Sequence, residues 1–129
     1  MDRLYKDVEL QEPIKVHELK SITHLRIEID HDKGGMSWGT GEMHKTGIKC
    51  NVTPIEKTQY GYSVLYDGKF EHQGFFVFLL DCGRKSPKKM QKVADVILPL
   101  ADKVTEMFLR GEYREIAVLM TETVKSAKI

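Results

Sequence analysis

The stretch from Phe75 to Lys92, FFVFLLDCGRKSPKKMQK, constrains the fold of this chain more than any other. Its six consecutive apolar residues, 75–80, are typical of a strand with both faces covered, so we expect this strand at the centre of a sheet. Ser86 and Pro87 then begin a helix, because serine accepts hydrogen bonds from free backbone N–H groups and proline suits the first helical position. Residues 82–92 carry basic side chains and no acidic one. A buried strand is therefore followed by a positively charged helix start.

The composition indicates one globular domain. The chain has 129 residues, of which 41% are hydrophobic and 30% are charged, with a net charge of +1. We expect a single domain over 1–129, with an N-terminal arm (1–20), a sheet (22–80) and two helices (86–126). No apolar run approaches the length of a membrane span, and the N-terminus does not resemble a signal peptide, so we expect a cytoplasmic protein. The two cysteines lack metal-binding spacing and read as small buried hydrophobes.

Alternating apolar and polar residues predict most of the strands. Residues 22–30 and 47–53 alternate, and Pro54 is expected to limit the second of these strands. Residues 60–66 are aromatic and β-branched enough for a strand, and Asp67-Gly68 suits a hairpin turn. The glycine-spaced residues 36–47 fit either a loop or a bulged strand. Residues 3–10 are compatible with a short helix ended by Pro13, after which residues 14–16 alternate like an edge strand.

Helical periodicity dominates the C-terminal third. Apolar residues recur at helical spacing from Met90 to Phe108, and we expect a kink at Pro99 and a stop at Gly111. A second helix is predicted from about 112 to 126. The fold class is thus α+β, an antiparallel sheet of about four or five strands packed against two C-terminal helices.

Two features leave the oligomeric state open. Two helices can cover only one face of strand 75–80, and Val118 and Leu119 lie off the main apolar stripe of the last helix. Either a homodimer or a larger internal core accounts for both observations.

The motifs that suggest catalysis are incomplete in this sequence. Residues 39–46 differ from a nucleotide-binding P-loop because His44 replaces the second glycine, and a strand rather than a helix follows. The five histidines show no metal-binding spacing, and Glu28, Asp30 and Asp32 are better explained as the solvated face of a strand. We therefore predict no catalytic residue, no metal and no cofactor. A site assembled in space from His24, Asp30 and His72 is the enzymatic alternative.

The charged helix start is the strongest functional signal. Cations there oppose the helix dipole, so their placement forgoes a small stabilisation. Free N–H groups and several cations together form a ready phosphate site. The predicted anion-binding or nucleic-acid-binding residues are Arg84, Lys85, Ser86, Lys88, Lys89 and Lys92. The alternative is a solvated helix start whose lysines only promote solubility.

Aromatic residues supply a second candidate surface. Trp38, Tyr60, Tyr62 and Tyr66 could stack on the bases of a single strand if a basic groove lay beside them. Aromatic residues on a half-buried strand more often belong to the core or to cross-strand pairs.

Three segments resemble a known group of proteins. Residues 32–36 (DKGGM), 46–57 (TGIKCNVTPIEK) and 84–89 (RKSPKK) are similar to a family of small proteins carried by mobile and conjugative elements of Bacteroides-type bacteria. The resemblance covers roughly residues 30–95 and brings no enzymatic residue. It implies an accessory protein of a mobile element with DNA or a protein as partner, whereas RNA is a partner that only the basic residues suggest.

Three functions follow in order of preference. The first is a non-enzymatic protein that binds nucleic acid or another polyanion through the basic helix start. The second is a protein-interaction module or homodimer that uses the last helix and the uncovered sheet face. The third is a small enzyme with a histidine and carboxylate site. No membrane partner is expected.

Overall fold

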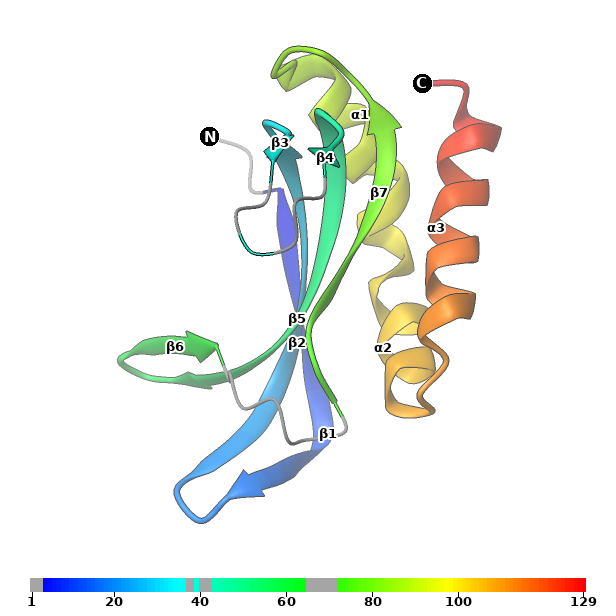
Figure 1. The fold of residues 1–129 in the computed structure, drawn as a ribbon. Coiled ribbons are helices and arrows are strands. Elements are labelled where there is room, and N and C mark those ends of the chain that lie inside the picture. Colours follow the sequence, from blue (N-terminus) through cyan, green and yellow to red (C-terminus); the bar gives the residue numbers. More distant parts are fainter. Residues whose placement is uncertain (1–3, 37–38, 40–42, 65–71) are drawn as a thin grey trace.

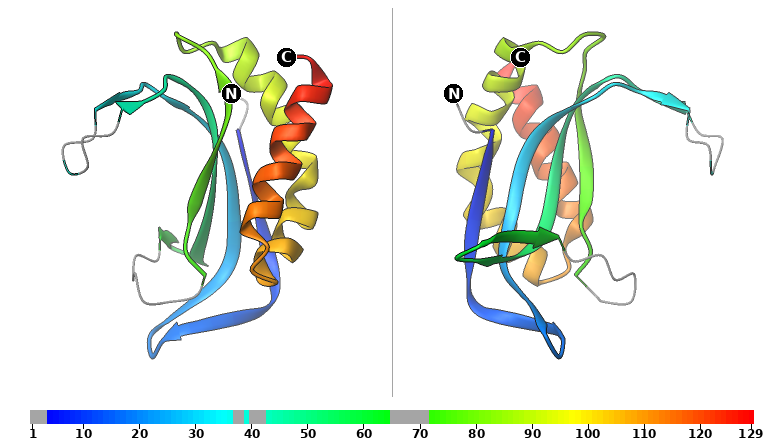
Figure 2. Two further views of the ribbon diagram at one scale, coloured as in Figure 1. Left: turned by 45° about the vertical axis from the view of Figure 1, so that its right-hand side comes forward. Right: turned by 90° about the vertical axis from the view of Figure 1, so that its left-hand side faces the viewer.

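Five strands of the described chain form one curved antiparallel sheet, and the described helices lie on one side of it (Figures 1 and 2). The computed structural model describes residues 4–36, 39, 43–64 and 72–129. The main sheet contains β1 (Tyr5–His17), β2 (Lys20–Asp32), β5 (Gly47–Thr58), β6 (Gly61–Val64) and β7 (Phe75–Asp81). A small second sheet pairs β3 (Gly35–Met36) with β4 (Met43–His44). The predicted α+β class is confirmed.

The long strand β5 organises the sheet. Along one side it pairs with β2, which in turn pairs with β1. Along its other side β5 pairs first with β7, from Gly47 to Val52, and then with β6, from Ile55 to Thr58. β5 therefore runs from the end of the sheet near the turn after β7, which carries Arg84 and Lys85, to the opposite end of the sheet.

Side chains alternate between a helix-covered face and an open face. Leu25, Ile27 and Ile29 of β2 join Cys50 and Val52 of β5 in the core under the helices. The intervening residues of both strands point to the open face, which no helix of the described chain covers (Figure 2). The period of two in both strands produces this division.

The helices follow the predicted pattern. α1 (Pro87–Ile97) continues through a 3₁₀ turn (Leu98–Leu100) into α2 (Ala101–Leu109), so the α-helix is interrupted at Pro99, where a kink was expected. Gly111 has a φ of 74°, a left-handed conformation that glycine adopts without penalty, and α3 (Tyr113–Ala127) follows. Buried side chains of all three helices pack on the sheet in one core. No helix in the described ranges is both long and apolar enough to cross a membrane.

The N-terminal segment corrects one prediction. Residues 3–10 were expected to allow a short helix, but residues 5–10 lie in β1, and Pro13 falls within an irregular stretch of the strand between Glu9 and Ile14. Val8 packs against the core, while Asp7 pairs with Arg26 across the ladder. Pairing with β2 therefore decides the conformation, because local propensity is weak beside a long ladder and an ion pair.

β7 corrects a second prediction. Among the described residues it pairs with β5 alone, so it lies at an edge and not at the centre of the sheet. Val77 is buried under the helices, whereas Phe76 on the open face is 51% exposed. Phe78 lies over Gly47, where an added Cβ would meet its ring at 2.5 Å. An uninterrupted apolar run here reflects local packing on the open face and not coverage by a second layer.

Pro54 does not end its strand, as the sequence suggested. β5 continues to Thr58, and Pro54 lies between the last pair with β7, at Val52, and the first pair with β6, at Ile55. A missing N–H is tolerated there because no described strand borders β5 on that side at this point. The predicted strand at 60–66 is present as β6, and the expected turn at 67–68 lies outside the described residues.

Candidate anion-binding site

The turn between β7 and α1 is fixed by buried groups. The backbone N–H of Cys82 donates to the carbonyl of Thr46 at 3.2 Å, and its buried thiol donates to the carbonyl of Arg84 at 2.8 Å. Gly83, Arg84 and Lys85 are exposed just beyond this anchor. The buried cysteine therefore holds the two basic residues of the turn at the surface.

Ser86 caps α1 as predicted. Its backbone is extended, with φ −119° and ψ 105°, and its Oγ accepts a hydrogen bond from the N–H of Lys89 at 3.3 Å. Pro87 occupies the start of the helix, whose first turn contains no acidic residue. Met90 and Val93 are buried on the core side, so Lys88, Lys89 and Lys92 project to solvent. Because the apolar side of α1 is buried in the core, the lysines on its other side face solvent.

The five cations of this region are exposed and have no ionic partner among the described residues. We call them the basic segment: Arg84, Lys85, Lys88, Lys89 and Lys92. None of the ion pairs found within the described part of the chain involves any of them. Positive side chains and the positive end of the helix dipole therefore add at the start of α1, whose first turn has no acidic residue.

A cavity of about 510 Å³ adjoins the basic segment. Residues from three regions line it: Asp30, His31, Lys33, Thr46, Gly83, Arg84 and Lys85. The Nε2 atom of His31 is buried and has no hydrogen-bond partner within the described ranges. The hydroxyl of Thr46 donates to the carbonyl of Lys33 at 2.8 Å. The lining thus combines three cationic side chains, Lys33, Arg84 and Lys85, with one carboxylate, Asp30.

Sequence reasoning did not find Lys33, Thr46 or His31. These residues come from the end of β2 and the approach to β5, and the antiparallel pairing of Asp32 with Gly47 and of Gly47 with Asp81 brings them to the basic turn. The only available signal was the turn after Asp32, where Gly34 adopts a φ of 75°. Their convergence depends on long-range strand register.

The two described stacking residues, Tyr60 and Tyr62, lie away from the basic segment. Tyr62 pairs with Lys57 near the far end of β5, while the basic turn lies beside Gly47. Tyr62 covers the guanidinium of Arg26, whose Cζ is 3.9 Å from the ring centroid, and Tyr60 is 91% exposed. Trp38 and Tyr66 lie outside the described residues. The structure therefore does not join the two described tyrosines to the basic segment.

The enzymatic alternative is not assembled. His24 and Asp30 share one face of β2, but six residues of extended strand separate them by about 20 Å. His72 packs its ring against Phe108, with the ring centroids 5.5 Å apart. No group of His, Cys, Asp or Glu side chains in the described part could hold a metal ion.

The open face carries a strong ion pair and two perturbed acids. Arg26 donates two hydrogen bonds to Asp7, which lowers the pKa of the Asp7 carboxyl, and Lys57 contributes to the same shift. Burial raises the pKa of Glu28, and the nearby charge of Asp30 adds to this effect.

In the core under the helices, burial raises the pKa of the Cys50 thiol to about 12. Cys50 therefore stays protonated at neutral pH and is no nucleophile.

Comparison with protein-family models, with curated proteins and with solved structures gave no match for this chain. The resemblance to proteins of mobile elements therefore stays a prediction. Function must be argued from the geometry.

Proposed function

We propose that this protein is a non-enzymatic binding protein that contacts the phosphate backbone of nucleic acid through its basic segment and the adjoining cavity. The observation that carries the proposal is the charge pattern of the α1 start. Five exposed cations lie there without an ionic partner among the described residues, and the first helical turn has no acid.

The extent of the basic segment favours a polymer over a single small anion. Lys88 and Lys92 are one helical turn apart, about 6 Å along the axis of α1, and Arg84 and Lys85 lie beyond the start of the helix. A single phosphate group is smaller than the whole basic segment, whereas successive phosphates of a strand continue along such a length. The cavity beside Arg84 and Lys85 provides a place for one phosphate, and the helix lysines extend the contact.

Binding of this kind depends on charge more than on base sequence. Lysine and arginine contacts to phosphate release condensed counterions, so affinity falls steeply as salt rises. Phosphate contacts position a protein on nucleic acid but do not read its sequence. We therefore expect modest affinity, strong salt dependence and little sequence preference.

The proposal is tested by the anisotropy of a fluorescent 20-base-pair duplex in dilute salt. Changing Lys85, Lys88 and Lys89 to alanine should weaken binding by about tenfold or more, because several phosphate contacts are lost. The matched control changes Lys20, Lys103 and Lys125, three exposed lysines elsewhere, and alters the net charge equally. Equal losses in the two variants, or no binding by the unchanged protein, would contradict a localised site.

The open sheet face supports a second candidate function, self-association. Phe76 is 51% exposed on this face, and β7 has one edge without a partner strand in the described part. Exposed apolar side chains beside a free edge are typical of interfaces. Sedimentation velocity should then show a dimer that Phe76→Ser dissociates. A monomer at high protein concentration would reject this candidate.

A further inference from the structure

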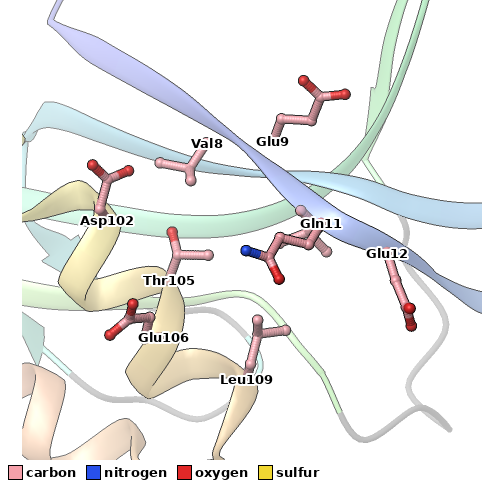
Figure 3. A pocket seen from close by; sticks show the side chains of 9 residues that line it. Val8, Glu9, Gln11, Glu12, Asp102, Thr105, Glu106 and Leu109 are labelled. Atoms are coloured by element: carbon pink, nitrogen blue, oxygen red, sulfur yellow. The ribbon is translucent and has the colours of Figure 1, made fainter.

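A second groove lies at the other end of the helical layer, between β1 and α2 (Figure 3). Its volume is about 490 Å³. Val8, Leu10 and Leu109 give it apolar walls, and Leu109 is 43% exposed. Gln11 points from β1 toward Thr105 and Leu109, across the groove. The buried hydroxyl of Thr105 is already used, since it donates to the carbonyl of Ala101 at 2.8 Å.

The rim of this groove is acidic. Four acidic residues border it, two from β1 and two from α2: Glu9, Glu12, Asp102 and Glu106. The Glu9 carboxylate points to the side of β1 away from α2 (Figure 3), so Glu12, Asp102 and Glu106 supply the charge. No basic residue is among the lining side chains, and none of the ion pairs of the described residues includes these four acids. The groove therefore has the charge opposite to that of the basic segment.

β1 offers backbone groups beside the groove. It is an edge strand, since within the described ranges it pairs with β2 alone. The register with β2 shifts between Glu9 and Ile14, so residues 10–13 have no partner residues in that ladder. An edge strand with unpaired N–H and C=O groups is a template for an added strand.

We propose that this groove binds an extended, lysine- or arginine-bearing peptide segment of a partner protein. The peptide adds along β1 through main-chain hydrogen bonds, and an apolar side chain of the peptide packs on Leu109. Asp102 and Glu106 are one helical turn apart, a rise of about 6 Å, which matches the spacing of about 6.6 Å between alternate side chains of an extended peptide. Cationic side chains at alternate positions can therefore meet both carboxylates.

The basic segment of the same molecule cannot fill this groove. Lys88 and Asp102 are separated by fourteen residues of nearly continuous helix, or about 21 Å. The occupant is therefore not the basic segment of the same chain. The inference does not depend on nucleic-acid binding, because the two surfaces share no residue.

The test uses a blocked, fluorescent seven-residue peptide that carries two lysines and one valine at alternate positions, with threonine at the positions between them, so that all three face α2. It is titrated with the full chain in dilute salt. Asp102→Asn combined with Glu106→Gln should lower the affinity about tenfold, the effect of losing charge-assisted contacts. The matched control, Glu115→Gln with Glu122→Gln, removes two exposed acids of α3 and should leave affinity unchanged. Circular dichroism verifies that both variants are folded. Equal losses in the two variants would overturn the proposal.

Two further probes separate strand addition from simple charge attraction. Backbone N-methylation of the peptide should weaken binding, and chemical-shift changes should concentrate at residues 8–12 and 102–109. Binding of spermine with the same affinity as the peptide would overturn the proposal in favour of a small-cation site. Self-association of the protein that the Asp102 and Glu106 variant abolishes would overturn it in favour of a second copy.

Discussion

Arg26 and Asp7 are joined by two parallel hydrogen bonds on the open face of the sheet, Nε to Oδ1 at 2.7 Å and Nη2 to Oδ2 at 2.9 Å. Both side chains are largely buried, with 11% and 7% of their surface exposed. Tyr5 and Tyr62 lie on the guanidinium at 4.3 and 3.9 Å. A bidentate pair between two rings ties β1 to β2, and β6 packs over it.

Asp7→Asn should destabilise the protein by about 2–4 kcal/mol, because it leaves the buried Arg26 charge without its partner. Urea unfolding measures the change. Glu122→Gln is the control, since it removes an exposed acid of α3, and it should stay within about 0.5 kcal/mol of the unchanged protein. Equal stability of Asp7→Asn and the unchanged protein would show that the pair contributes nothing net.

Asp7 and Glu28 should change the free energy of unfolding in opposite directions as pH falls. The pKa of Asp7 is below its ordinary value of 3.8, so its contribution is present above that pH and is lost as pH falls through the folded value. The pKa of Glu28 is above its ordinary value of 4.5, so ionised Glu28 destabilises the fold at neutral pH and protonation removes this effect.

Glu28→Gln should therefore stabilise the protein at pH 7 relative to the unchanged chain. The difference should shrink as pH falls through the raised pKa and should be small below the ordinary value of 4.5. Thermal unfolding of both proteins from pH 7 to pH 4 tests this. A variant that is less stable at pH 7 would mean that Glu28 makes favourable contacts when ionised.

Gly47→Ala should destabilise the protein by about 2–3 kcal/mol through overpacking. An added Cβ would clash with the carbonyl oxygen of Leu80 and would lie 2.5 Å from the Phe78 ring. Gly83→Ala is the matched control, because no heavy atom lies within 4 Å of its added Cβ. Chemical denaturation of both variants should separate them clearly, and similar stabilities would refute the close packing of β7 on β5.

Two substitutions at Ser86 separate capping from charge. Ser86→Ala removes the cap and should cost about 1 kcal/mol of stability. Ser86→Asp keeps a capping oxygen and adds a favourable charge at the helix start, so its stability should be unchanged or higher. The aspartate should nevertheless weaken duplex binding, which anisotropy measures. Unchanged duplex affinity for Ser86→Asp would place the binding surface elsewhere.

The helices could be predicted closely because their signals are local. The expected second helix at 112–126 is α3 at Tyr113–Ala127, and Ser86 caps α1 as its sequence indicates. Helical periodicity, the proline at 99 and the glycine at 111 need no knowledge of distant residues.

The misread strands depended on distant partners. β1 forms because β2 pairs with it, and β7 tolerates an edge because Gly47 makes room for Phe78. The basic segment was found from the sequence, but its cavity was not. His31, Lys33 and Thr46 reach Arg84 only through the register of β2 and β7 on β5. No local pattern encodes that convergence.

The most direct test of polyanion binding is the slope of the logarithm of duplex affinity against the logarithm of salt concentration. Each phosphate contact contributes about −0.9 to this slope. We predict a slope of about −3 to −4 for the unchanged protein, and a slope shallower by about 2–3 when Lys85, Lys88 and Lys89 are alanine. A slope near zero, or the same slope in the variant, would contradict the account.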